Sequence, residues 1–218
     1  MSDARDKKVK GGVVLLSAFK SRIEHQFSDN EEFIINTKRM FKDELDQIEA
    51  MADGADEDTA ELLFDDYRKK EKIFPEMFMT AWIITTFSYF EHWLDRLVIV
   101  VPDLLDMELG KWPKVQGKFN RAERHLQRDC SLKIQGDLFD KMAFYKRLRN
   151  QLAHAGRILS SKKTLVRELE AYNDIECRES HGSKVKIVVQ KQFARTMNND
   201  LRELLLAIVE NSKQAIRG

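Results

Sequence analysis

The sequence predicts an all-α protein, a helical bundle with a small β-hairpin inserted near residues 175–190. Composition favours helices, because 33% of the 218 residues are charged and the chain has three prolines and nine glycines. Apolar side chains also recur at helical spacing along most of the chain. The hydrophobic fraction of 43% is sufficient for a substantial core. No internal repeat is present, so a single domain over residues 1–218 is expected.

The N-terminal third is predicted to form helices joined by an acidic turn. The pattern is helical between Val13 and Met51, and Ser28-Asp29-Asn30 is typical of a break followed by a new N-cap, so two helices are expected. The acidic stretch 53–58 lacks the spacing of a calcium loop and is expected to be a solvated linker. Another helix is expected from about Glu61 to Lys72.

A long, aromatic-rich helix is expected next. Pro75 begins it, it runs from Glu76 to Val101, and Pro102 ends it, because proline suits a first turn and disrupts a helix interior. Its apolar run is interrupted by four polar or charged residues: Glu91, His92, Asp95 and Arg96. Such a cluster is poorly tolerated in a bilayer, so we expect the central helix of a bundle, with no membrane association.

The C-terminal half is predicted to contain three helices and the hairpin. A basic amphipathic helix is expected over Phe119–Arg128 and another over Leu138–Ala155, before Gly156. Partial alternation on both sides of a turn at 181–183 predicts the hairpin. Helical spacing with one apolar face returns over residues 193–216.

Composition also limits the classes of function. The net charge of +1, from 37 Lys+Arg against 36 Asp+Glu, excludes a globally basic nucleic-acid wrapper but allows a local basic patch. Cys130 and Cys177 are the only cysteines, and no Cys/His cluster has metal-ligand spacing, so neither metal nor cofactor is expected. Isolated thiols and an N-terminus without a long apolar segment predict a cytoplasmic protein.

The histidines outside the predicted helix 138–155 are expected to be structural. His25, His125 and His181 have no partners at usable spacing and are expected at the surface. His92, on the aromatic-rich helix, is expected to be a hydrogen-bonded core histidine.

The most informative stretch is Lys146–Gly156, which places Arg149, Asn150 and His154 at the end of a predicted helix. Arginine can neutralise a phosphate, and histidine titrates near neutral pH and can transfer a proton. Asn150 precedes His154 by one helical turn, a spacing at which it can hydrogen-bond the ring. Arg149 lies about 140° around an ideal helix from His154.

The same helix has a predicted core face and a polar stripe. Tyr145, Leu148, Leu152 and Ala155 form the core face. Arg147 lies on the stripe with Asn150 and His154. A purely structural alternative has Arg147 and Arg149 as surface charges and His154 as a C-cap, where an imidazolium suits the helix dipole.

The Arg149-Asn150-x3-His154 motif, closing a helix in a helical chain, resembles the signature of the HEPN superfamily. The resemblance covers roughly residues 74–216 and the first 72 residues only loosely. It implies a metal-independent endoribonuclease in which a 2′-OH attacks the adjacent phosphate. His154 would then act as acid or base, Arg149 would hold the phosphate and Asn150 would orient His154. Glu91 matches an acidic position of the family's second core helix and would pair with Arg149 or orient His154.

The resemblance also implies partners. RNA would be the substrate, and two copies of the motif would face one another in a homodimer. A role as a toxin or anti-phage defence effector is implied, with an antitoxin or regulatory protein as a further partner. Basic residues would guide the RNA backbone electrostatically: Arg147, Arg121, Arg124 and Arg128.

Two alternatives to catalysis remain open. One is a non-catalytic HEPN-like module that binds nucleotide, RNA or a protein partner. The other is a structural helical protein in which the match to the motif is accidental.

Overall fold

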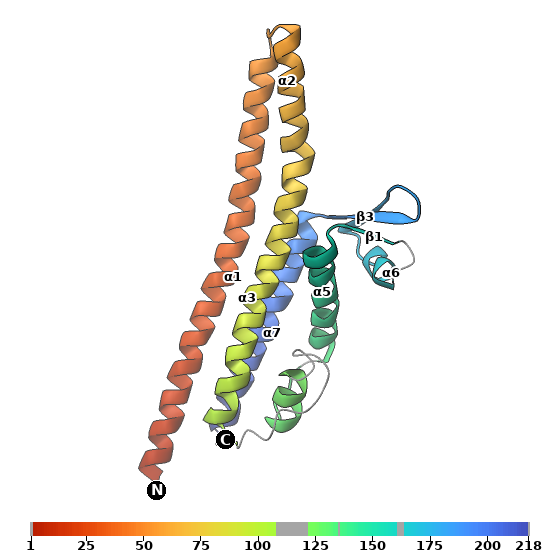
Figure 1. Ribbon diagram of the computed structural model, residues 1–218. Helices are drawn as coiled ribbons and strands as arrows, with labels where there is room; N and C mark the ends of the chain where they lie inside the picture. Colours follow the sequence, from red (N-terminus) through yellow and green to blue (C-terminus); the bar gives the residue numbers. More distant parts are fainter. Residues whose placement is uncertain (1, 108–121, 135, 161–163, 218) are drawn as a thin grey trace. The chain divides into compact units, whose positions relative to one another are not determined.

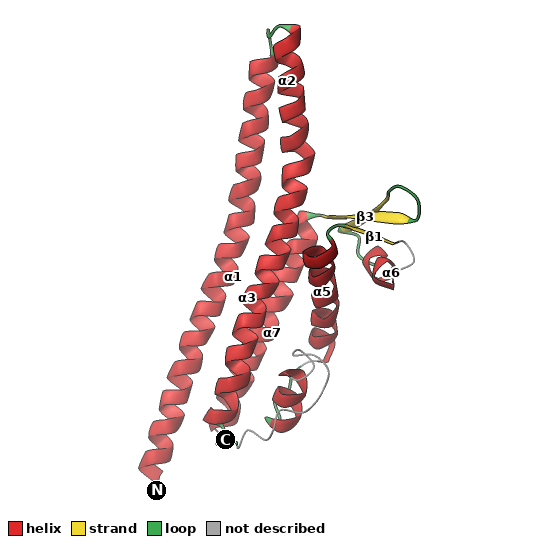
Figure 2. Ribbon diagram, viewed as in Figure 1, coloured by secondary structure: helices red, strands yellow, loops and turns green. Residues whose placement is uncertain are grey.

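The computed structural model describes residues 2–107, 122–134, 136–160 and 164–217. It is mostly helical with one small antiparallel sheet (Figure 1, Figure 2), which agrees with the predicted class. The helices are α1 (Ser2–Ala52), α2 (Glu57–Arg68), α3 (Phe74–Leu104), α5 (Gly136–Ala155), α6 (Thr164–Glu170) and α7 (Lys191–Arg217). Two π-helical segments are η1 (Lys69–Ile73) and η2 (His125–Asp129).

The chain divides into two compact units, each built from separate stretches of sequence. The first unit comprises Met1–Ser28, Thr86–Arg147 and Met197–Gly218, and the second comprises Asp29–Thr85 and Leu148–Thr196. Helices α1, α3, α5 and α7 each contribute residues to both units. The boundaries between the units therefore fall within helices.

Helix α1 is continuous, so the predicted break at Ser28-Asp29-Asn30 is wrong. Phe27 and Ile34, on either side of that point, are 0% and 2% exposed, and the buried stripe continues through it without a change of phase. A capping side chain contributes about 1 kcal/mol. Burying one large apolar side chain contributes about 1.5–3 kcal/mol. The continuous stripe therefore outweighs the local preference for a cap.

The first unit is a helical bundle whose polar contacts join neighbouring helices. Trp93 Nε1 donates to Gln26 Oε1 at 2.7 Å, joining α3 to α1. Tyr145 donates from its hydroxyl to Asp200 Oδ2 at 2.6 Å, joining α5 to α7. The predicted apolar face of α7 is confirmed, because its five residues are fully buried: Leu201, Leu204, Leu205, Ile208 and Val209.

The second unit contains a helical hairpin made by α1 and α2 (Figure 1). Gly54, with φ of +92°, lies in the turn between them, and Asp56 caps α2 by accepting from Thr59 N at 2.8 Å. The predicted acidic turn is thus confirmed, although α2 begins earlier than expected. The chain passes through η1 directly into α3, with Pro75 in the first turn of α3 as predicted.

Helix α3 continues to Leu104, three residues beyond the predicted last residue Val101. Pro102 lies inside it, and the chain leaves the helix after Leu104, with Asp106 at φ of +54°. Its aromatic side chains pack in the core as expected, including Phe87 and Phe90, which are fully buried. None of the described helices is long and apolar enough to cross a membrane.

The sheet includes the predicted hairpin and one strand that the sequence did not indicate. Strands β2 (Ile175–Glu179) and β3 (Lys184–Val189) pair with Cys177 opposite Ile187. Strand β1 (Ile158–Ser160) adds to the other side of β3, with Leu159 opposite Val185, which gives the order β1-β3-β2. Helix α6 was not predicted either.

Burial of the histidines differs from expectation at two positions. His25 and His181 are exposed as predicted. His92 is exposed rather than part of the core, because it lies on the outward stripe of α3. His125 is 7% exposed rather than at the surface.

Candidate functional site

The motif lies at the C-terminal end of α5, which stops at Ala155 as predicted. Gly156 follows with φ of +67°, the left-handed conformation that commonly ends a helix. Gln151 Nε2 donates to the carbonyl oxygen of Gly156 at 3.2 Å and closes this end. Leu148 and Leu152 are buried as expected, whereas Ala155 is exposed because it is the last residue of the helix.

The three motif residues have different environments. Arg149 and Asn150 are half-buried and joined by a hydrogen bond of 2.9 Å from Arg149 Nη1 to Asn150 Oδ1. His154 is exposed in the last turn, and its side chain makes no hydrogen bond to any residue within the described parts of the chain. Asn150 therefore positions Arg149 here, and the expected contact between Asn150 and His154 is not formed.

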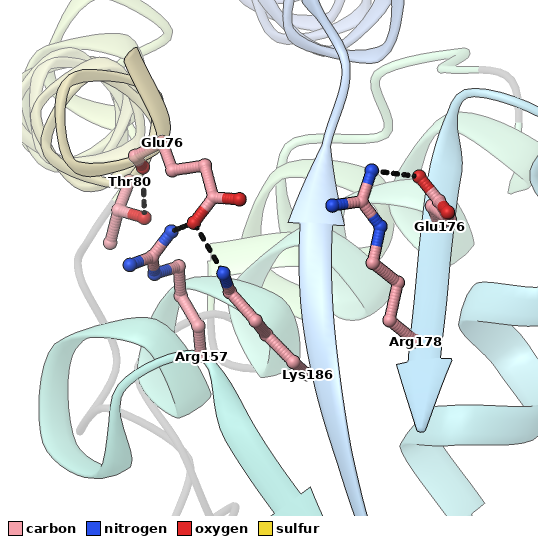
Figure 3. Close-up of polar contacts among 6 residues, drawn as sticks. All are labelled: Glu76, Thr80, Arg157, Glu176, Arg178 and Lys186. Atoms are coloured by element: carbon pink, nitrogen blue, oxygen red, sulfur yellow. Dashed lines mark hydrogen bonds and ion pairs between the residues drawn. The ribbon is translucent and has the colours of Figure 1, made fainter. Parts of the chain in front are cut away.

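An ion cluster fixes the chain just after the motif. Arg157 forms a hydrogen-bonded ion pair with Glu76 in the first turn of α3, and Lys186 Nζ on β3 lies 2.7 Å from the same oxygen, Glu76 Oε2 (Figure 3). The carbonyl oxygen of Arg157 also accepts from Ile187 N at 2.7 Å. The end of α5 is thereby attached to both α3 and β3.

The charges in this cluster determine the ionisation of Glu76. Burial by itself raises the pKa of Glu76, but the hydrogen bond from Lys186 and the charge of Arg157 outweigh it and bring the pKa below the ordinary 4.5. Glu76 is therefore ionised at neutral pH. With two cations and one anion, the cluster retains a net positive charge.

The sequence around the motif is locally basic, a pattern that the net charge of +1 conceals. No acidic residue occurs between Asp140 and Glu168. That interval contains Lys141, Lys146, Arg147, Arg149, Arg157, Lys162, Lys163 and Arg167. A stretch of this charge suits a polyanion better than a cationic ligand.

The other predicted site residues that the structure describes lie in the first unit, whereas the motif lies in the second. Glu91 is half-buried on α3. Arg147 is exposed on α5, and Arg124 and Arg128 are exposed around η2. Arg121 lies outside the described residues.

Two polar arrangements were missed from the sequence. The first is the ion cluster, whose members come from three distant segments. The second is the pair formed by His125 Nδ1 and Asp129 Oδ2 at 2.8 Å, with His125 buried. The spacing of four residues on a helix was the signal available for this pair.

Other chemistries have less support. Burial raises the pKa of the Cys130 thiol to about 11 and also raises that of Cys177, so neither thiol is ionised at neutral pH. Within the described residues, no group of His, Cys, Asp and Glu side chains could hold a metal ion. A cavity of about 350 Å³ in the first unit, lined by Lys8 and Leu104 among others, includes no motif residue.

Comparisons of the chain with protein-family models, curated proteins and solved structures find no match.

Proposed function

We propose that this protein is a HEPN-type endoribonuclease that cleaves RNA without a metal ion. The proposal is supported chiefly by the exposed His154 at the end of a helix that also carries Arg149 and Asn150. The basic stretch between Asp140 and Glu168 favours a polyanionic substrate. As a toxin or anti-phage defence effector, such an enzyme would be restrained by an antitoxin or regulatory protein.

The reaction joins the 2′-oxygen of a ribose to the adjacent phosphorus and breaks the bond from phosphorus to the 5′-oxygen. The products are a 2′,3′-cyclic phosphate and a 5′-hydroxyl. A base removes the 2′-proton, an acid protonates the leaving oxygen, and a cation stabilises the charge on the phosphorane. His154 transfers a proton, and Arg149, oriented by Asn150, stabilises the charge.

A homodimer completes this mechanism. The entering and leaving oxygens lie on opposite sides of phosphorus, so a single histidine is poorly placed to serve both. An isologous dimer brings the same surface of two chains together and supplies the second His154. In this arrangement one imidazole is the base and the other is the acid.

A non-catalytic binding module is the second candidate. It is favoured by one observation: no hydrogen bond within the described residues orients the His154 ring, whereas Arg149 is held by Asn150. An arginine held in this way suits phosphate recognition even without proton transfer. RNA binding that survives loss of His154 would be its signature.

Cleavage of total RNA in EDTA distinguishes these two functions. We expect the wild-type protein to produce 5′-hydroxyl ends, and His154→Ala to lower the rate at least about a hundredfold. His181→Ala is the control, because His181 is also exposed but lies in the hairpin turn. Cleavage that requires added metal, or equal rates for both variants, would contradict the proposal.

A further inference from the structure

Helix α2 leaves two large apolar side chains, Leu62 and Phe64, in solvent. It has no buried residue, and Leu62 and Phe64 are 75% and 68% exposed. Met51, at the end of the neighbouring α1, is 57% exposed. Large apolar side chains gathered on one element commonly mark a surface that another chain covers.

The charge of the same region is predominantly negative, although Lys70 pairs with Glu44 and Asp66, and Arg68 pairs with Asp65. The acidic tip, defined here as residues 43–67 of the hairpin, has no lysine, arginine or histidine. It contains Asp43, Glu44, Asp46, Glu49, Asp53, Asp56, Glu57, Asp58, Glu61, Asp65 and Asp66. Such a surface attracts cations and repels polyanions.

The contacts between the two helices place the exposed apolar residues on definite flanks. Tyr67 donates to Glu49 at 3.0 Å, and Lys70 lies 3.3 Å from Glu44. In the antiparallel register that these contacts define, Met51 lies at about the level of Phe64, and Leu62 is within one helical turn of it. On ideal helices with about 100° per residue, Met51 and Leu62 then share one flank of the hairpin, and Phe64 lies on the other.

We propose that the flank carrying Met51 and Leu62 is a docking surface for a basic amphipathic helix of another protein. Its apolar side chains would cover Met51 and Leu62, and its lysines or arginines would face the acidic tip. A second copy of this chain is disfavoured as the occupant, because two acidic tips repel one another. RNA is disfavoured for the same reason.

Titration with a defined peptide tests the docking surface. The probe is a fluorescent synthetic helix of leucine and lysine with its leucines on one face, and binding is followed by anisotropy using the full-length protein. We expect Leu62→Ser and Met51→Ser each to weaken binding about tenfold, the scale of one lost apolar contact. Phe64→Ser is the matched control and should bind like wild type. Because all three side chains are exposed, the variants should fold normally.

Three results would overturn the docking surface. One is equal weakening by Phe64→Ser, and another is equally tight binding of a peptide with the same composition but no apolar face. The third is a lower mass of Leu62→Ser than of wild type in sedimentation without peptide, which would identify a second copy as the occupant. Binding that weakens with salt, together with unchanged RNA cleavage by Leu62→Ser, is the expected pattern.

Discussion

Replacing Glu76 by glutamine should destabilise the fold and loosen the end of the motif helix. The Glu76 and Arg157 side chains are 15% and 23% exposed, and Lys186 is 35% exposed. A buried charge-assisted hydrogen bond contributes about 1.5–3 kcal/mol, and solvent reduces the contribution of Lys186. Glutamine still accepts one hydrogen bond, so we expect Glu76→Gln to lose about 2 kcal/mol of unfolding free energy. For a chain of this length, the melting temperature should fall by about 4–8 °C.

The effect should depend on pH in a defined direction. The folded protein holds the pKa of Glu76 below its ordinary 4.5. Its contribution to stability is therefore present above that value and is lost as the pH falls through the lowered pKa. Denaturant melts at several pH values should show a constant difference in unfolding free energy between wild type and Glu76→Gln near neutrality. This difference should disappear as the pH falls below 4.5.

A matched control comes from the neighbouring pair drawn in Figure 3. Glu176 and Arg178 are 2.7 Å apart on β2, but their side chains are 47% and 53% exposed. Glu176→Gln should leave the melting temperature unchanged. A stabilising role for the ion cluster is refuted if Glu76→Gln is as stable as wild type at pH 7, or if its deficit in unfolding free energy persists at low pH.

Three further predictions concern the motif. Arg149→Ala should lower the rate of RNA cleavage at least about a hundredfold, whereas Arg147→Ala should mainly weaken RNA binding and its salt dependence. In single-turnover assays, the reverse ranking of the two variants would show that the wrong arginine was assigned. Gly156→Ala should lower the free energy of unfolding by about 1–2 kcal/mol, because φ of +67° is strained for alanine even though an added Cβ meets no atom within 4 Å. An unchanged midpoint in denaturant melts would disprove this. Sedimentation at micromolar concentration should give twice the mass of one chain. Mixed dimers with one His154→Ala chain should lose nearly all RNA cleavage, whereas half of the wild-type cleavage would indicate two independent sites.

The sequence predicted elements well where local signals and long-range packing agree. Helix α5 was placed almost correctly, because its apolar stripe ends at Gly156, a residue suited to positive φ. The hairpin was found because β2 and β3 are adjacent in sequence around the turn at Gly182. The break expected at Ser28 failed because a buried stripe several turns long outweighs one local cap.

The features that were missed depend on contacts between distant residues. Strand β1 has three residues, too few for a periodic signal, and exists because it pairs with β3. Arg157 and Glu76 are 81 positions apart, so no spacing indicates their ion pair. The motif residues could be named from the sequence, but the bond between Arg149 and Asn150 depends on side-chain conformations that spacing does not specify.

The most direct test of the proposed activity uses one defined RNA with and without a single 2′-deoxy substitution at the cleaved nucleotide. Both RNAs are incubated with the protein in EDTA, and the products are analysed by mass spectrometry. If the 2′-OH is the nucleophile, the all-ribose RNA yields a 2′,3′-cyclic phosphate and the substituted RNA stays intact at that position. Cleavage of the 2′-deoxy substrate at the same bond would contradict the account.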